Sequence, residues 1–301
     1  MTTHDVRHTQ AGGPPLQDWV GRTEQCTDLL TQRPADALAA TLDRDDGPYS
    51  AGTALPALWH WLYFLDIFKL QDAGYDGHAA LGRFLPPVPL PRRMWAGSRL
   101  TWHAPMQIGQ SLTKTSEILS VQEKTGRSGP LVFVTVAHRF QDAGTLCLSE
   151  EHDIVYRGHA LSGADAAAQP PAPHKAPQSA DFSRTITPSP VLLFRYSALT
   201  FNGHRIHYDR SFCEHSEGYG GLVVHGPLLA TLMLDLLRRQ TPQARLTSFT
   251  FRAQAPVLDT DAFDVQGALR SATSADLWIT RHDGTEAMRG FATWDTAEHT
   301  S

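Results

Sequence analysis

The chain has 301 residues, of which 41% are hydrophobic and 19% charged, and its formal net charge at pH 7 is −5. This composition is typical of a globular protein with two small domains or one double-length domain, long enough to bury a sizeable core. The slight acidity argues against a general attraction to nucleic acid or to anionic membranes, so neither is an expected partner.

Cysteine usage and hydropathy narrow the class of protein further. Cys26, Cys147 and Cys213 are far apart in the sequence and form no CxxC pair, so neither a disulfide framework nor a cysteine–zinc site is expected. No stretch has the length and apolarity of a signal peptide core or a membrane span. These features favour a cytoplasmic protein.

The first half begins with helical patterns. Residues 1–14 are polar and rich in His and Gly, and we expect them to be a disordered lead-in. Residues 16–42 carry apolar side chains at helix-like spacing. Residues 55–65 are apolar nearly all round and have an early proline, which predicts a buried helix. The proline-rich residues 84–91 predict a loop or an extended segment.

Antiparallel strands are predicted after these helices. β-branched and aromatic residues alternate with polar ones, and turn signals such as Gly126, the Gly129-Pro130 pair and Gly144 separate the runs. The predicted strands cover residues 100–103, 111–124, 131–140 and 145–155. One helix followed by a meandering sheet is the outline of a helix-wrapped antiparallel domain, here assigned to residues 15–158.

The same order of elements recurs in the second half. Residues 159–181 are rich in Ala and Pro and poor in large apolar side chains, which is typical of a linker. A buried helix is predicted from Gly226, with Pro227 in its first turn. The strands predicted after it cover residues 246–253, 263–269, 277–281 and 286–294, the last two joined by a turn at Asp283-Gly284. Residues 182–298 therefore form a second domain of similar outline.

Polar chemistry is concentrated just before that second helix. Residues 202–209 contain an amide, two imidazoles, a guanidinium, a phenol and a carboxylate, directly after an apolar run. Such a group of side chains is costly to bury unless it is well paired or used. About sixteen residues further on, a glycine-rich turn leads through His225-Gly226 into the helix. The two stretches together predict a functional site.

This pair of stretches resembles the MaoC-like R-specific enoyl-CoA hydratases (hydratase 2 family) of the hot-dog fold. The family signature reads Gly-Asp-x-Asn-Pro-x-His, followed by a His-Gly that opens the central helix. The family histidine falls on His207, the His-Gly on His225 and Gly226, and the family aspartate on Asn202. The asparagine form is similar to one branch, the mesaconyl-C4-CoA and itaconyl-CoA hydratases and the 3-hydroxyacyl-thioester dehydratases.

The resemblance implies a fold and a reaction. The fold is α+β, a double hot-dog of two helix-wrapped antiparallel sheets in one chain, with a non-catalytic first half similar to FAS1-like dehydratases and a catalytic MaoC-like second half. The activity is that of a hydro-lyase, the reversible hydration of a 2-enoyl-CoA. A short branched dicarboxylic acyl group of the mesaconyl or itaconyl type is the substrate that this branch favours.

Roles in the reaction follow for three residues. His207 is the expected acid/base group, since an imidazole exchanges protons near pH 7. Asn202 can orient water through its amide. Gly226 offers its N–H to the thioester oxygen at the helix start, where Pro227 has no N–H to give. The expected supporting residues are His204, Asp209 and His225.

Substrate contacts are predicted from charge and position. Arg195 or Arg205 could pair with a second carboxylate of the substrate, because guanidinium binds carboxylate in a bidentate way. Tyr196 and Tyr208 fit the substrate site and the core equally well. The basic residues expected to be able to meet CoA phosphates are Arg92, Arg93, Lys124 and Arg127.

Other functions stay open at this point. A metal is not expected, although His204 and His207 lie three residues apart, because no further ligand cluster accompanies them in the sequence. No cofactor is expected either, since CoA is part of the substrate, and a homodimer is possible. The alternatives are a hot-dog thioesterase and an acyl-thioester-binding module that has lost catalysis, the second suggested by the missing aspartate.

Overall fold

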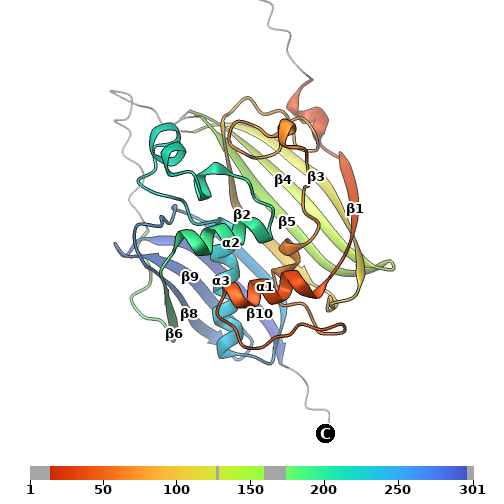
Figure 1. Ribbon diagram of the computed structural model, residues 1–301, viewed down its shortest axis with the longest axis vertical. Helices are drawn as coiled ribbons and strands as arrows, with labels where there is room; N and C mark the ends of the chain where they lie inside the picture. Colours follow the sequence, from red (N-terminus) through yellow and green to blue (C-terminus); the bar gives the residue numbers. More distant parts are fainter. Residues whose placement is uncertain (1–13, 127–128, 159–173, 297–301) are drawn as a thin grey trace, which may run out of the picture.

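The computed structural model describes residues 14–126, 129–158 and 174–296, and its main feature is one ten-stranded antiparallel sheet (Figure 1). The strand order is β1-β3-β4-β5-β2-β7-β10-β9-β8-β6. In chain order the strands are β1 (Thr23–Leu29), β2 (Arg92–Trp102), β3 (Ser111–Gly126), β4 (Gly129–Asp142), β5 (Thr145–Arg157), β6 (Phe182–Ile186), β7 (Ala244–Ala253), β8 (Phe263–Ser271), β9 (Ser274–Arg281) and β10 (Glu286–Thr296). All the strands predicted from the sequence are present, most of them longer than expected.

The two halves of the chain meet in the middle of this sheet. β1 to β5 come from the first half and β6 to β10 from the second, and the junction is the antiparallel pairing of Gly97–Thr101 in β2 with Ser248–Arg252 in β7. Gly97 is required there, because a Cβ at this position would overlap the carbonyl oxygen of Phe251. The halves therefore share one continuous hydrogen-bonded sheet.

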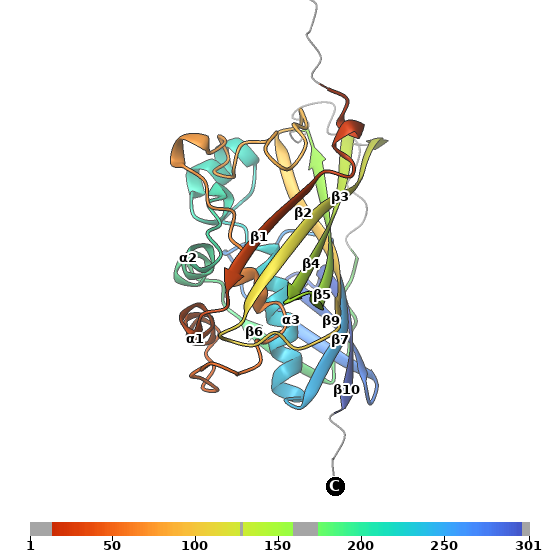
Figure 2. The ribbon, with the colours of Figure 1, turned by 90° about the vertical axis from the view of Figure 1, so that its right-hand side faces the viewer.

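Helix α3 (Gly226–Gln240) is the central helix of the second half. Ten consecutive residues, Leu228 to Leu237, are buried, as expected for a helix that is apolar all round. Pro227 lies in its first turn, and Arg238 and Arg239 lie in its last turn, where they oppose the helix dipole. α3 lies between the sheet and two further helices, α1 (Gln32–Thr41) and α2 (Pro190–Leu199) (Figure 2). The prediction of this buried helix is confirmed.

The first half has no matching central helix among its described residues. The helix predicted over residues 55–65 is wrong: only the 3-10 turn η2 (Trp59–Leu62) forms. Leu58, just before it, has a left-handed backbone (φ 68°), and the Leu55 N–H bonds to the Met106 carbonyl rather than within a helix. The segment is buried because it packs as bulky side chains under the sheet, not because it is helical.

The helix-like spacing over residues 16–42 corresponds to a helix over only part of this segment. The structure divides it into the 3-10 turn η1 (Leu16–Trp19), the edge strand β1 and the helix α1. β1 pairs with β3 over its whole length, from Thr23 opposite Glu117 to Leu29 opposite Ser111. Tertiary pairing overrides local spacing here.

A buried ion-pair group joins the two halves beside α3. The carboxylate of Asp235 is 2% exposed and lies 2.7 Å from Arg44 of the first half, 3.1 Å from Arg184 of β6 and 2.8 Å from Arg239. Three guanidinium groups around one carboxylate satisfy its hydrogen-bonding capacity, which buried charge requires. The relative position of α3 and the first half is thereby fixed.

Two predicted segments lie largely outside the described residues, the lead-in 1–14 and the linker 159–181, so the domain boundaries stay predictions. The described part of the chain contains no helix that is both long and apolar enough to cross a membrane. The remaining short helical turns are η3 (Leu70–Asp72), η5 (Arg205–His207) and the π-helical turn η6 (Phe212–Glu217).

Candidate active site

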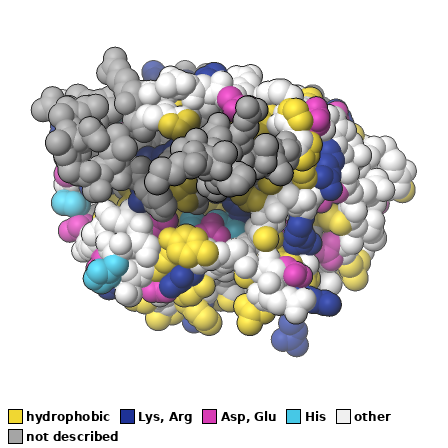
Figure 3. All heavy atoms as spheres, turned by 90° about the horizontal axis from the view of Figure 1, so that it is seen from above, with side chains coloured by type: hydrophobic (Ala, Val, Ile, Leu, Met, Phe, Trp, Pro, Cys, Tyr) yellow, Lys and Arg dark blue, Asp and Glu magenta, His cyan; other side chains and the backbone are white. Residues whose placement is uncertain are grey.

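A cavity of about 370 Å³ lies between the two halves. The second half contributes Tyr196, Thr200, Asn202, Gly203 and Pro227 to its wall. The first half contributes the loop around η2, the loop before β2 and the inward faces of β2 to β5, including Trp61, Phe64, His78, Arg93, Trp95, Lys114, His138, Phe140, Glu150 and His152. Seen from above, the molecule is hollowed, and histidine and charged side chains lie inside the hollow (Figure 3). Of the predicted site residues in the second half, Asn202 and Tyr196 line this chamber of apolar, basic and acidic side chains, whereas His207 and Gly226 are not part of its lining.

Asn202 stands at the turn that leads out of α2. The turn is tight: Phe201 has a left-handed backbone (φ 49°), and the Asn202 N–H bonds to the Ser197 carbonyl at 2.9 Å. The side-chain Oδ1 accepts from the His204 N–H at 2.9 Å. This bond fixes the amide, and it leaves the amide N–H₂ group as the part of Asn202 that can serve the cavity.

His207 lies in η5, with 6% of its surface exposed. Its Nδ1–H donates to the Val223 carbonyl at 2.7 Å, which fixes the tautomer and leaves a lone pair on Nε2. Burial lowers the pKa of His207 to about 3, so the imidazole is neutral at pH 7. A neutral imidazole with a free Nε2 lone pair is a proton acceptor.

His225 packs against the ring of His207. The two rings stack at 3.6 Å between centroids, and Nε2 of His225 is 2.8 Å from the Ser197 hydroxyl of α2. Burial keeps the pKa of His225 well below its ordinary value, so this ring is also neutral. Ser197, His225 and His207 thus form a packed column that holds the motif against α2.

The start of α3 supplies a backbone donor. His225 precedes the helix, and its carbonyl accepts the Leu229 N–H at 3.0 Å. The Gly226 N–H belongs to the first turn, whose N–H groups have no partner within the helix, and the dipole adds partial positive charge there. No atom lies within 4 Å of a Cβ built on Gly226. The Gly226 N–H is thus a backbone donor next to Pro227, which lines the cavity.

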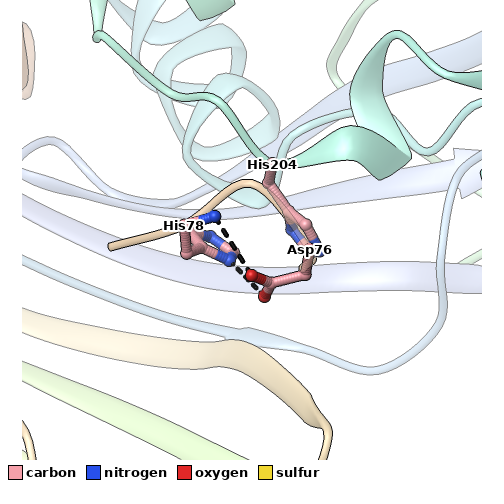
Figure 4. A group of neighbouring side chains, drawn as sticks. All are labelled: Asp76, His78 and His204. Carbon is pink, nitrogen blue, oxygen red and sulfur yellow. Dashed lines mark hydrogen bonds and ion pairs between the residues drawn. The ribbon is translucent and has the colours of Figure 1, made fainter. Parts of the chain in front are cut away.

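A second group, Asp76 and His78, was missed in the sequence. Both lie in the loop between η3 and β2, and their side chains point toward each other and toward His204 (Figure 4). The Nδ1 atom of His78 is 2.7 Å from Oδ2 of Asp76, and the ring centroids of His78 and His204 are 4.0 Å apart. The Asp-Gly-His spacing over residues 76–78 is a turn signal in the sequence, but nothing local connects it to a motif 125 residues further on.

These three side chains could hold a metal ion. Their donor atoms all lie within 4.8 Å of one another. Burial, His78 and His207 lower the pKa of His204 to about 2, so its ring is neutral and able to coordinate. The hydrogen bond between Asp76 and His78 already uses one atom of each, an arrangement that is equally typical of a carboxylate that orients a histidine. The absence of a metal stays a prediction.

The other predicted residues of the motif have structural partners. Arg205 pairs with Asp209 at 2.8 Å, lies 4.2 Å over the Phe212 ring and donates to the Tyr75 carbonyl. A bond from the Phe212 N–H, together with Arg205, lowers the pKa of Asp209. Tyr208 is exposed and donates to the Gly203 carbonyl at 2.9 Å. Of the two predicted tyrosines, Tyr196 lines the cavity.

The predicted basic residues separate in space. Arg195 is exposed on α2 and lines a different depression, beside Arg184 and Leu42. Arg92 is buried in an ion pair with Glu217 at 2.8 Å, and exposed Lys124 lies over the Phe133 ring. Arg127 lies outside the described residues. Arg93 is the one member of this predicted set that lines the cavity among the residues described.

The far wall of the cavity carries a polar network that sequence patterns did not reveal. Glu150 is 2% exposed and is surrounded by His60 at 3.0 Å, His152 at 2.8 Å and the Trp61 indole N–H at 3.2 Å. Burial alone would raise the pKa of Glu150, but His152 and His60 hold it well below its ordinary value. Glu150 and His152 alternate along β5 and look like ordinary strand positions in the sequence, and only the fold brings η2 with His60 and Trp61 against them.

Comparisons with known sequences agree with this arrangement. The model of the family described as hydroxyacyl-thioester dehydratase type 2 matches residues 58–259. The chain is 46% identical to mesaconyl-C(4)-CoA hydratase of Chloroflexus aurantiacus over 90% of this chain and 94% of that protein. It is 30% identical to the mitochondrial hydroxyacyl-thioester dehydratase type 2 of Schizosaccharomyces pombe, over 84% and 91% of the two chains.

Solved structures show the same fold. A MaoC-like dehydratase from Phytophthora capsici superposes with a TM-score of 0.67 at 16% identity, covering 93% of this chain and 98% of that one. A Mycobacterium tuberculosis protein described as a double hot-dog superposes with a TM-score of 0.58 at 15% identity, covering 91% and 96%. The predictions of a double hot-dog fold and of a hydratase-type enzyme are confirmed.

Proposed function

Since the chain belongs to the hydroxyacyl-thioester dehydratase type 2 family, we propose that it reversibly hydrates a 2-enoyl-CoA with a short branched dicarboxylic acyl group of the mesaconyl-C4 or itaconyl type. The observation that carries the proposal is that a proton acceptor and a backbone N–H donor lie close together at one motif. A neutral imidazole (His207), whose Nε2 has no hydrogen-bond partner among the described residues, lies beside the N-terminus of α3, where the Gly226 N–H has no such partner either. Together they supply a proton acceptor and an oxyanion donor.

The chemistry follows from these two groups. As the oxygen of water bonds to C3 of the enoyl group, Nε2 of His207 takes the proton that the water loses. The C2=C3 electron pair moves toward the thioester oxygen, where the Gly226 N–H and the dipole of α3 stabilise the developing negative charge. Asn202 orients the water through its amide. The enolate then needs a proton at C2, which Asn202 cannot supply because an amide does not titrate near neutral pH.

The cavity wall supports a second carboxylate on the substrate. Arg93 and Lys114 both line it, and neither forms an ion pair with a carboxylate among the described residues. The acidic residues of the lining have other partners: Asp66 pairs with Arg83, and Glu150 is held by His60 and His152. The two basic groups therefore favour an anionic ligand in this partly buried chamber. This assignment replaces Arg195 and Arg205, which the structure places in other contacts. No separate cofactor takes part in the proposed reaction, and the cytoplasmic location and the homodimer stay predictions.

An absorbance assay tests the function directly. Purified protein is mixed with mesaconyl-C4-CoA, itaconyl-CoA or crotonyl-CoA, and the enoyl-thioester band and free thiol are followed together. A hydratase removes the enoyl absorbance without releasing thiol, and the dicarboxylic substrates should give the higher kcat/KM. Release of thiol would instead indicate a thioesterase. Binding without either signal would indicate the acyl-thioester-binding module that Asn202 in place of the family aspartate suggests.

A further inference from the structure

We propose that a second cavity, of about 550 Å³, binds a small carboxylate with an apolar body and holds it without catalysis. This second cavity lies between the two halves of the chain, beside the C-terminal end of α3, and shares no lining residue with the active-site cavity. It is the counterpart of the active site in the internal symmetry of the fold. Binding there does not depend on the proposed hydration.

The two halves are related by an approximate two-fold rotation. In the sheet, β1-β3-β4-β5-β2 is followed by β7-β10-β9-β8-β6, so each half has its first strand at an outer edge and its second at the junction. The rotation axis passes through the junction where Arg99 pairs with Thr250. It therefore exchanges Trp95 with Leu246, each four residues earlier in its strand. Trp95 lines the active-site cavity, and Leu246 lines the second cavity.

The same turn follows the two symmetry-related helices, α1 and α2, which lie side by side (Figure 1). Asp43 and Phe201 each come two residues after the helix and have a left-handed backbone, with φ of 55° and 49°. The next residue, Arg44 or Asn202, bonds through its N–H to the carbonyl five residues earlier, at 3.0 and 2.9 Å. Arg44 therefore occupies in the second cavity the place that Asn202 has in the active site.

The acid/base groups of the motif have no counterparts in the second cavity. The Leu55 N–H bonds at 2.8 Å to the loop between β2 and β3, just as the residue before His225 bonds at 2.8 Å to the loop between β7 and β8. Pro56 therefore stands in the place of His225. Counted from the turn, Tyr49 stands in the place of His207, and its hydroxyl already donates to a carboxylate at 2.7 Å. A proline and a bonded phenol of raised pKa exchange no protons near pH 7, so binding without catalysis follows.

Apolar and aromatic side chains form most of the inner wall of the second cavity. The rings of Tyr49 and Trp59 lie 5.0 Å apart between centroids. The other large apolar residues of the wall are Leu55, Trp102, Met106, Leu234, Leu237 and Leu246. A concave site with such walls and a few polar groups is typical of small organic ligands. The apolar body of a ligand would pack against these side chains.

The charges beside this wall favour an anion. The carboxylates of Asp46 and Asp235 are shared by four guanidinium groups, those of Arg44, Arg184, Arg238 and Arg239. One further carboxylate, Asp43, lies 3.7 Å from Arg184, but its side chain is 87% exposed and therefore well screened. The group of charges thus carries an excess of positive charge.

Two of the arginines keep donors for a ligand. Arg238 lies 5.1 Å over the Trp59 ring and uses only one nitrogen, Nη2, in hydrogen bonds with described residues. Arg245, at the exposed rim, forms no ion pair within the described part of the chain, although Asp295 stands opposite it across β7 and β10. Guanidinium donors beside an aromatic wall suit a carboxylate, which accepts two N–H bonds in parallel.

Calorimetric titration with mesaconate, a small dicarboxylate with an apolar body, tests the second cavity. Leu246→Trp fills the cavity and should abolish one binding event. Arg245→Met should weaken the same event by about 10-fold, because a charge-assisted hydrogen bond is lost. The matched control is Arg252→Met, an exposed arginine of the same strand outside the cavity lining. Lys114→Met, in the active-site cavity, should leave this event unchanged.

A second series of titrations uses the CoA thioester of methylsuccinate, which has no double bond to hydrate. An event that Leu246→Trp removes in both series would mean that the second cavity accepts the carboxylate in free and thioester form. Removal in one series only would support the cavity and identify the free acid or the thioester as its ligand.

Other results would overturn the proposal. If neither Leu246→Trp nor Arg245→Met changes any binding event, the second cavity holds no carboxylate. An event that is lost only in Lys114→Met belongs to the active site. If circular dichroism shows that Leu246→Trp does not fold, the comparison of Arg245→Met with Arg252→Met decides alone, and equal affinities would refute the site. Hydration is assayed in parallel, and its absence in wild type would refute the proposed function without changing the result for the second cavity.

Discussion

The close contact between the loop of residues 74–79 and the motif can be tested with one methyl group, in the variant Gly77→Ala. Gly77 has φ 90°, and an added Cβ would overlap the carbonyl oxygen of Gly203 and stand 3.0 Å from its carbonyl carbon. Both neighbours are backbone atoms, which cannot rotate away as a side chain could. The loop must therefore move away from the motif.

Two separate costs are expected from this change. An alanine in the left-handed region is strained by about 1–2 kcal/mol wherever it stands. The overlap adds a displacement on the order of 1 Å between His78 and the motif, and a misplacement of that size can cost about 100-fold in rate. Gly52→Ala separates the two costs, because Gly52 has φ 85° but no atom within 4 Å of a built Cβ.

The measurements are kcat/KM for hydration and the free energy of unfolding in urea. Gly52→Ala should lose about 1–2 kcal/mol of stability with kcat/KM unchanged. Gly77→Ala should lose at least as much stability and about 100-fold in kcat/KM. If Gly77→Ala retains near-native kcat/KM, the docking of this loop is not needed for catalysis, and the reasoning that places the loop in the site is refuted.

Three further predictions concern charge and protonation. His207→Gln should lower kcat by about 10²–10⁴-fold in the absorbance assay with little change in circular dichroism; a near-native rate would remove His207 from the proton-transfer role. Lys114→Met should lower kcat/KM for mesaconyl-C4-CoA by about 10–100-fold and leave crotonyl-CoA unaffected, with exposed Lys69→Met as control; equal losses on both substrates would argue against a carboxylate contact. Stability should fall as pH drops below 6.5, because burial lowers the pKa of His207 to about 3 and the unfolded chain then binds the extra proton. This group alone should cost about 1.4 kcal/mol between pH 5.5 and 4.5 in urea titrations, and a flat profile would contradict the burial of a neutral His207.

The wrongly predicted helix over residues 55–65 bears on how the cavity arises. In the second half α3 lies under the sheet, with ten consecutive buried residues. In the first half the single turn η2 occupies the corresponding place, so the inward faces of β2 to β5 line a cavity. The same outline thus gives a packed core on one side and a binding chamber on the other.

The amino-acid sequence by itself determined the local features of this protein. Alternating β-type residues and turn signals located the strands, an all-round apolar run opened by Gly226-Pro227 located α3, and the motif at Asn202 and His207 indicated the family and the reaction. Each of these rests on residues close together in the chain, where spacing translates directly into a helix face or a strand face.

Tertiary structure alone decided which distant residues meet. Asp76 and His78 reach the motif, and Arg93 and Lys114 reach the cavity, only because β2 and β7 join the two halves in one sheet. Arg195, only twelve residues before His207, is carried to another face by the turn of α2. Once strand pairing and helix direction are fixed, residues far apart in the sequence can be neighbours and residues close together can lie on different faces. The positions of the charged side chains in the cavity therefore depend on how the two halves pair, which local sequence patterns do not reveal.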